Sequence, residues 1–394
     1  MNFDNIVNRK GTYCTQWDYI KDRFGSNDLL PFTISDMDLE SPIEIVESII
    51  QRANHKIFGY SRWNNDDFKN AIEYWYKKRF NFNIDKDTIC YSPSVIYAVS
   101  TFIKMKSKEE DNIIVFTPVY DGFFKTIKAN NRNILELPLL KNTQGKYDLD
   151  FELFEEYCKK SSILLFCSPH NPIGKIWSVE ELSKIIEICK KYNVFIISDE
   201  IHMDIAYTKH TPILKINTDY KKLVLITSAS KTFNIPALIG AYLLIPNEKD
   251  MEEFLYILKD KDALSSASIF GVIATINAYN KCEYWLDELL EYTKKNIKYI
   301  ITYLNKNIPE LKCVMPESSY FAWVDYSSLN IEDDLFQKYL IEVGKVAIMD
   351  GITYGEAGRY HLRINTACSI KKIEDCMQRI SKTVDHIKSL NINN

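Results

Sequence analysis

The chain contains five short runs of apolar residues, separated by longer stretches of mixed composition. The runs are rich in Ile, Val, Leu and Phe, and polar residues do not alternate with apolar ones inside them. Strands covered on both faces have this pattern, and parallel sheets flanked by helices contain such strands. We therefore predict buried strands at 112–116, 163–167, 194–198, 223–227 and 241–245.

The segment between the second and third runs has the pattern of an amphipathic helix. Within 178–193, "SVEELSKIIEICKKYN", apolar residues recur at helical spacing. Ser178 is a suitable N-cap, and Glu181 completes a capping box three positions later. Strand, helix and strand in this order predict an α/β fold with a mostly parallel central sheet flanked by helices.

The pattern changes after about residue 280, where longer helical stretches are mixed with short strand candidates. This mixture predicts a smaller α+β domain at the end of the chain. The predicted elements are helices at 283–306, 333–344 and 371–388, and strands within 320–326, 345–349 and 360–365. We divide the chain into an N-terminal segment that packs with the small domain (1–45), a large domain (46–280) and the small domain (281–394).

Composition excludes several classes of partner. The 394 residues are 46% apolar and 26% charged, with a formal net charge of -4, so no basic surface for nucleic acid is expected. No apolar run reaches membrane-spanning length, and the first ten residues lack the apolar core of a signal peptide. Nine scattered cysteines without a C-x-x-C pair argue against a disulfide framework and a zinc site. We expect a cytoplasmic protein without a catalytic metal.

Polar side chains follow four of the predicted strands at the point where each ends. Tyr120, Asn171, Asp199 and Lys231 follow the first four runs in that order. Each has an ordinary explanation: a core tyrosine, a turn residue, a helix cap and a loop lysine that reaches water. Ligands of open α/β sheets bind beyond the carboxyl ends of the strands, so the coincidence of all four favours one shared site.

Pyridoxal 5′-phosphate is a cofactor that would use all four side chains. Its aldehyde reacts with a lysine amine, and a carboxylate keeps its ring nitrogen protonated so that the ring accepts electrons. An amide such as that of Asn171 can donate to its phenolic oxygen, and Tyr120 can stack on its ring. A lysine at a strand end, as Lys231 is, would then form its covalent bond inside a dry pocket.

The phosphate of this cofactor requires hydroxyl groups and a helix N-terminus. Ser228 and Ser230 supply hydroxyls beside the lysine. The stretch 91–105, "YSPSVIYAVSTFIKM", opens a helix whose free backbone N–H groups at Val95 and Ile96 can face the phosphate.

Several segments of the chain resemble a known enzyme family. The segments "SPHNPIG", "SDEIH" and "TSASKTFNIPAL" resemble the fold-type I pyridoxal-phosphate enzymes, the aspartate aminotransferase superfamily. The likeness is closer to the cystathionine β-lyases of the MalY/PatB type and runs from about residue 3 to residue 370. The segments that carry it are "GTYCTQWDY", "LLPFTISDMD", "FGYSRW", "PSVIYAVS", "LSSASIF" and "KVAIMDGITYGEAGRYHLRIN".

The resemblance implies a role for each strand-end residue. Lys231 would hold the cofactor covalently and later carry a proton. Asp199 would pair with the ring nitrogen, and Tyr120 would stack on the ring as the third catalytic residue. Asn171 would bind the phenolic oxygen and contribute to substrate binding.

Two further residues gain a role only through the resemblance. Arg363 would bind the substrate α-carboxylate with a bidentate fork, although alone it reads as a surface strand residue. Tyr60 would reach the phosphate of a neighbouring subunit, although alone it reads as a core tyrosine. The resemblance therefore implies a homodimer with a shared active site.

The chain departs from the aminotransferase pattern at two positions. Ile239 stands where those enzymes often place an arginine that holds the phosphate, eight residues after the lysine. His202 stands where they place a tyrosine, three residues after the aspartate, and we count it among the cofactor-binding residues. Both departures resemble the β-lyase branch and leave the role of His202 open.

Three functions fit these observations. The first is a carbon–sulfur β-lyase that converts cystathionine or cysteine S-conjugates to a thiol, pyruvate and ammonia. The second is an aminotransferase on the same fold. The third is a regulatory protein with a structural cofactor, which the presence of both Lys231 and Asp199 disfavours. We expect the β-lyase, with an unidentified thiol leaving group.

Overall fold

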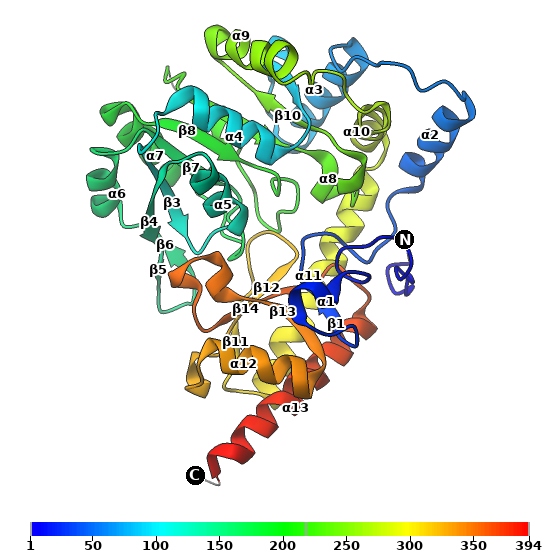
Figure 1. The fold of residues 1–394 in the computed structure, drawn as a ribbon, viewed down its shortest axis with the longest axis vertical. Helices are drawn as coiled ribbons and strands as arrows, with labels where there is room; N and C mark the ends of the chain where they lie inside the picture. The colour runs from blue at the N-terminus through cyan, green and yellow to red at the C-terminus, as the bar shows by residue number, and fades with distance from the viewer. Residues whose placement is uncertain (1, 217–218, 393–394) are drawn as a thin grey trace.

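The computed structural model describes residues 2–216 and 219–392 and contains two main β-sheets. The larger sheet has seven strands in the order β2-β10-β9-β8-β7-β3-β4 (Figure 1). Its strands are β2 (Ile89–Ser92), β3 (Asn112–Thr117), β4 (Asn133–Pro138), β7 (Ile163–Cys167), β8 (Phe195–Asp199), β9 (Leu223–Thr227) and β10 (Ala241–Leu244). The associated helices are α2 (Ile43–Asn54), α3 (Asp66–Phe80), α4 (Val95–Lys106), α5 (Asp121–Ala129), α6 (Phe151–Cys158), α7 (Val179–Tyr192), α8 (Ala229–Thr232), α9 (Glu248–Tyr256) and α10 (Ile269–Lys281).

The predicted strands are confirmed, and nearly all of their residues are buried, as expected for strands covered on both faces. Strands β4, β3, β7, β8 and β9 run parallel, whereas β10 pairs antiparallel with both β9 and β2. Parallel neighbours need a long crossover, usually a helix that covers one face of the sheet. The connection between β9 and β10 contains only the short helix α8 and a 3₁₀ turn at Pro236–Leu238. It has no long helix that crosses a face of the sheet, and β10 returns in the opposite direction.

Helix α7 is built as the sequence predicts. The Ser178 hydroxyl accepts from the Glu181 backbone N–H, and the Glu181 carboxylate accepts from the Ser178 N–H, which completes the capping box. Asn193 ends the helix in the left-handed region at φ 61°. The helix buries one apolar face and connects β7 to β8 as the crossover of a parallel unit.

The second sheet has five strands in the order β1-β13-β14-β12-β11. Strand β1 comes from the N-terminal part of the chain and pairs parallel with β13. The strands are β1 (Leu30–Phe32), β11 (Lys312–Cys313), β12 (Phe321–Asp325), β13 (Val346–Asp350) and β14 (His361–Asn365), and a two-stranded hairpin consists of β5 (Leu140–Lys141) and β6 (Tyr147–Asp148). The remaining helices are α1 (Ile20–Phe24), α11 (Glu283–Asn307), α12 (Asp333–Tyr339) and α13 (Ile370–Ile392). None of the helices among the described residues is both long and apolar enough to cross a bilayer.

Helix α11 takes part in both hydrophobic cores. Its first half places Trp285, Leu286 and Leu289 in the core under the seven-stranded sheet. Its second half places Ile300 and Leu304 in the core of the five-stranded sheet. Figure 1 shows this helix running from one sheet to the other. One continuous helix therefore joins the two cores.

Candidate active site

The carboxyl ends of four adjacent parallel strands meet at one edge of the large sheet. Strands β3, β7, β8 and β9 are neighbours in this sheet and point the same way. Asp199 is the last residue of β8, and the segments after the other three strands carry Tyr120, Asn171 and Lys231. Four predicted site residues therefore lie at the same edge of the sheet. Arg363 on β14 reaches this edge from the small sheet, because its Nη1 donates to Asn171 Oδ1 at 3.1 Å.

Lys231 lies in the short helix α8, which follows β9 directly. Its Nζ donates to the backbone carbonyl of Ser35 at 2.9 Å. Burial lowers the pKa of the Lys231 amine to about 8, and the Arg363 charge lowers it further, whereas the charges of Asp36 and Asp199 oppose this shift. An amine with this pKa is partly neutral near pH 7 to 8, which is the form that reacts with an aldehyde.

Asp199 is the last residue of β8 and is buried. Burial raises the pKa of its carboxyl to about 7, and the neighbouring Glu200 charge raises it too, while the Ile201 N–H and Lys231 oppose the shift. Oδ1 accepts from the Ile201 N–H at 3.1 Å. One hydrogen bond does not offset the cost of burying a charged carboxylate. A protonated ring nitrogen beside Asp199 would lower the pKa of its carboxyl again and keep it ionised.

Arg363 is a buried cation, although its sequence context resembled a surface strand. Nη2 donates to the Thr33 carbonyl at 2.9 Å, and the guanidinium lies over the rings of Phe321 and Tyr354, with Cζ 4.0 and 4.9 Å from their centroids. Within the described part of the chain, Arg363 has no carboxylate partner, and its buried Nε has no hydrogen-bond acceptor. A buried cation without an anion is costly, so the site fits an incoming carboxylate.

The charges of other site residues act on Tyr120 and His202. Burial raises the pKa of the Tyr120 hydroxyl, and the Asp121 and Asp199 charges add to this effect. Burial lowers the pKa of His202 to about 3, and the Lys231 and Arg363 charges lower it further, so its imidazole is neutral. Among the residues that the structure describes, the buried Nδ1 of His202 has no hydrogen-bond partner, so it is available to a bound group.

The expected phosphate site is assembled from two strand ends. Strands β2 and β10 pair so that Ser92 lies opposite Ala241, which brings the start of α4 close to Gly240. The Ser94 hydroxyl caps α4 by accepting from Tyr97, and the first-turn N–H groups at Val95 and Ile96 have no intrahelical acceptor. This helix start has the donor chemistry that a phosphate needs.

The Ser228 hydroxyl differs from our expectation of a free phosphate donor. It donates to the Gly240 carbonyl at 2.6 Å and accepts from the Ser230 N–H at 3.1 Å. A phosphate at this place would therefore require the Ser228 hydroxyl to turn. The Gly240 carbonyl and a phosphate would compete for the Ser228 hydroxyl. The sequence does not show this, because the bend between β9 and β10 brings Gly240 to Ser228.

Tyr60 is not brought to the cluster within one subunit. Its side chain is fully exposed (100%), so the alternative of a core tyrosine is wrong. Ile239, at the position of the absent arginine, is 54% exposed and adopts a strained φ of 59°. Within a single subunit, neither Tyr60 nor Ile239 is therefore a buried part of the expected phosphate site.

The irregular segment 33–39, part of the stretch "LLPFTISDMD", crosses the cluster, and its contacts with the site residues were not predicted from the sequence. Its backbone carbonyls accept hydrogen bonds from Arg363, Lys231 and Asn365, and also from Tyr320 and Asn234. The signal was present in "FTISDMD", where two aspartates stand in an otherwise weakly polar stretch.

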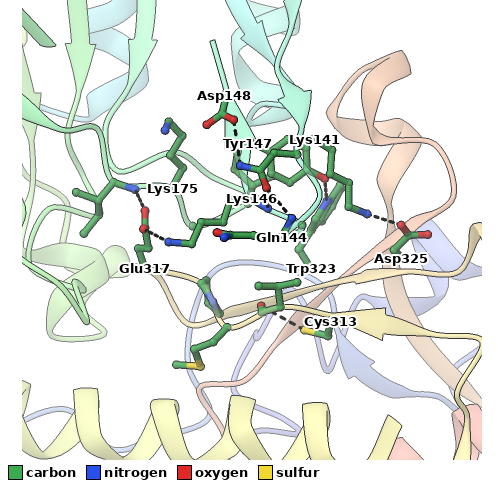
Figure 2. Close-up of a pocket in the computed structure, with 18 of the residues that line it drawn as sticks. Lys141, Gln144, Lys146, Tyr147, Asp148, Lys175, Cys313, Glu317, Trp323 and Asp325 are labelled. Carbon is green, nitrogen blue, oxygen red and sulfur yellow. Dashed lines mark hydrogen bonds and ion pairs between the residues drawn. The ribbon is translucent and has the colours of Figure 1, made fainter. Parts of the chain in front are cut away.

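A separate cleft of about 620 Å³ lies beside the candidate site, between the β5–β6 hairpin and the β11–β12 region (Figure 2). None of the predicted site residues lines it. Its charged side chains are largely paired with one another: Lys146 contacts Glu317 at 2.9 Å, Lys175 contacts Glu181 at 2.8 Å, and Lys141 contacts Asp325. These pairs leave the cleft without a strong charge of either sign. This cleft therefore gives no reason to move the candidate active site away from the strand ends.

Comparison with known proteins identifies the class of protein that carries this fold and site. Residues 27–380 match the family described as "Aminotransferase class I and II", and the chain belongs to this family. It is 45% identical to Protein MalY of Escherichia coli over 95% of this chain and 96% of that protein. It is 35% identical to the cystathionine beta-lyase PatB of Bacillus subtilis over 96% of this chain and 99% of that protein.

A solved structure extends these similarities. Cystalysin from Treponema denticola, whose structure contains a pyridoxal 5′-phosphate cofactor, superposes with a TM-score of 0.92 at 29% identity, over 98% of this chain and 99% of that chain. The predicted fold type and the resemblance to the MalY/PatB branch are confirmed. The chain is a pyridoxal-phosphate-dependent enzyme of the carbon–sulfur β-lyase type.

Proposed function

We propose that this enzyme cleaves the Cβ–S bond of cystathionine or of cysteine S-conjugates and releases a thiol, pyruvate and ammonia. The observation that supports an amino-acid substrate is the buried Arg363, which lacks a carboxylate partner among the described residues and hydrogen-bonds Asn171. The 35% identity to a cystathionine beta-lyase supports cleavage of the Cβ–S bond. A substrate α-carboxylate would supply the missing anion. An amino acid bound there has its α-carbon near the strand-end residues.

Each residue has a distinct task in this proposal. When bound, pyridoxal 5′-phosphate supplies an aldehyde for covalent attachment and a ring that accepts electrons. Lys231 Nζ accepts the proton from the substrate α-carbon and can return it to a later acceptor. Asp199 keeps its partner nitrogen protonated, and Asn171 and Tyr120 hold the ring plane. The fork of Arg363 fixes the substrate so that the α-hydrogen faces Lys231.

The residues at the start of α4, together with Ser228 and Ser230, would hold the phosphate. The first-turn N–H groups at Val95 and Ile96 and the positive end of the helix supply the attraction for an anion. His202 is neutral and offers its unpartnered Nδ1 to the same cofactor.

We also propose that the active unit is a homodimer with shared sites. Tyr60 is fully exposed, and several apolar side chains on α2 and on the segment that follows it are exposed as well. These side chains are Ile43 (51%), Ile50 (54%), Ile57 (64%) and Phe58 (62%). Such a patch is typical of an interface, and a second subunit would cover it and bring Tyr60 to a phosphate. The nine cysteines are free thiols, which supports a cytoplasmic location.

An aminotransferase is the second candidate, because the family name covers such enzymes. Both reactions need Lys231, Asp199 and Arg363, so these residues do not distinguish them. The departures at His202 and Ile239 favour elimination, as they match the β-lyase branch.

The deciding experiment measures pyruvate from L-cystathionine without any added keto acid. We expect many turnovers, with ammonia and homocysteine in equal amounts. The Lys231→Ala variant should lose both the turnover and the covalently bound cofactor. Rapid formation of glutamate from 2-oxoglutarate, without pyruvate from cystathionine or any cysteine S-conjugate, would contradict the β-lyase and support the aminotransferase.

A further inference from the structure

Segment 33–39 places backbone carbonyls against the reactive side chains of the site. Ser35 is central, because its carbonyl accepts from Lys231 Nζ and from the Tyr320 hydroxyl, each at 2.9 Å. On either side, the Ile34 and Asp36 carbonyls accept from Asn365 Nδ2 at 2.8 and 2.6 Å. The position of this segment therefore determines what surrounds the Lys231 nitrogen.

Two aspartates hold this segment through shared partners. Arg9 donates to Asp36 at 2.6 Å and to Asp38 at 2.9 Å. Gln16 also donates to both carboxylates, at 2.9 and 3.2 Å. Asp38 has an additional ion pair with Lys372. The two carboxylates thus have similar structural roles and similar burial, with side-chain exposures of 13% for Asp36 and 8% for Asp38.

The two aspartates differ in their relation to Lys231. Asp36 directly follows Ser35, whose carbonyl holds the Lys231 nitrogen. The charged groups that act on this nitrogen are Asp36, Arg363 and Asp199, and Asp38 is not among them. The charge of Asp36 raises the pKa of Lys231 more than the charge of Asp199 does.

We propose that Asp36 is a positioning residue that stabilises the protonated nitrogen of Lys231 and is itself fixed by Arg9 and Gln16. The proposal rests on the proposed covalent and proton-carrying roles of Lys231. When Lys231 accepts the α-proton, the Cα–H bond breaks, an N–H bond forms, and the electron pair stays on the substrate side. The new positive charge then lies against the Ser35 carbonyl, and the next residue of the segment, Asp36, has its carboxylate fixed by Arg9 and Gln16. The fold therefore holds a negative charge in place before the proton arrives.

The test is a pH titration of the visible absorbance band of the lysine-linked cofactor in the holoenzyme. Asp36→Asn should lower the midpoint pH of this band by roughly half a unit to one unit, because an opposite charge near the nitrogen is removed. Asp38→Asn is the control, since it also changes a carboxylate held by Arg9 and Gln16, although it affects Lys372 and Trp17 as well. Its midpoint should stay within about 0.2 units. An unchanged midpoint in Asp36→Asn, or equal shifts in both variants, would overturn the proposal.

A second variant should shift the midpoint pH of the band in the opposite direction. Arg9→Gln removes the cation that competes for Asp36, so its midpoint should rise. If Asp36→Asn does not fold, Arg9→Gln decides alone: a rise supports the proposal, and an unchanged or lower midpoint refutes it. Failure of the proposed function is detected separately, because a band that persists in Lys231→Ala would refute the role of Lys231 whatever the midpoints are.

Discussion

At the scale of single residues, the site places a basic and an acidic group of similar pKa side by side. Burial lowers the pKa of Lys231 to about 8 and raises that of Asp199 to about 7. Both groups therefore change protonation near neutral pH, which is where a lysine must give and take a proton. Burial supplies most of this match, and the charges of Glu200 and Arg363 add to it.

The raised pKa of Asp199 predicts how the cofactor-free protein responds to pH. The folded state binds the Asp199 proton up to about pH 7, whereas the unfolded chain releases it near 3.8, so this residue reduces stability as pH rises through that window. Asp199→Asn should remove this pH-dependent loss of stability. The difference between the two pKa values corresponds to at most about 4 kcal/mol in the free energy of unfolding at pH 8.

The measurement is urea unfolding of the cofactor-free proteins at pH 5 and pH 8. Asp199→Asn should gain stability over the wild type at pH 8 and lose most turnover once cofactor is added. Asp28→Asn is the control, because Asp28 is an exposed aspartate on the surface. Equal pH dependence in the wild type and in Asp199→Asn would show that Asp199 is already ionised before the cofactor binds.

How far the sequence predicted individual site residues depends on their place in the fold. Lys231, Asp199, Asn171 and Tyr120 could be proposed from the residues because each lies within four positions of the end of an apolar run. Arg363 was proposed only through the family resemblance, since the burial of its strand comes from packing across the two sheets, which a short alternating run does not report.

At the scale of elements, the predicted strands and helix α7 agree closely with the structure. Periodicity identifies such elements because their burial repeats along the sequence. Segment 33–39 has no repeating pattern, so its carbonyls and the role of Ser35 could not be predicted. The direction of β10 also depended on what connects it to β9, and the run 241–245 alone does not contain that information.

The capping box of α7 gives a prediction at this scale. Ser178→Ala removes the acceptor for the Glu181 N–H and should lower the free energy of unfolding by about 1 kcal/mol. Ser183→Ala is a matched control in the same helix, because the Ser183 hydroxyl only donates to the Val179 carbonyl one turn earlier. Urea unfolding curves of the two variants should separate, and coincident curves would mean that the cap contributes little.

At the scale of the whole molecule, the exposed apolar surface on α2 and residues 57–60 predicts association. Light scattering at assay concentrations should give the mass of two chains. Ile50→Asp places a charge in the exposed patch and should weaken the dimer by more than tenfold, whereas Leu140→Asp, at an equally exposed site (55%) in the β5–β6 hairpin, should not. An active monomer would refute the shared site.

Because helix α11 is continuous, the protein is difficult to divide into two fragments that fold separately. A fragment that stops before residue 283 leaves the large core without Trp285, Leu286 and Leu289. A fragment that starts after residue 307 leaves the small core without Ile300 and Leu304. Two separately expressed halves would therefore each need their own copy of this helix. The two sheets are distinct in architecture. Exchanging or engineering them as independent domains would nevertheless require a second copy of helix α11.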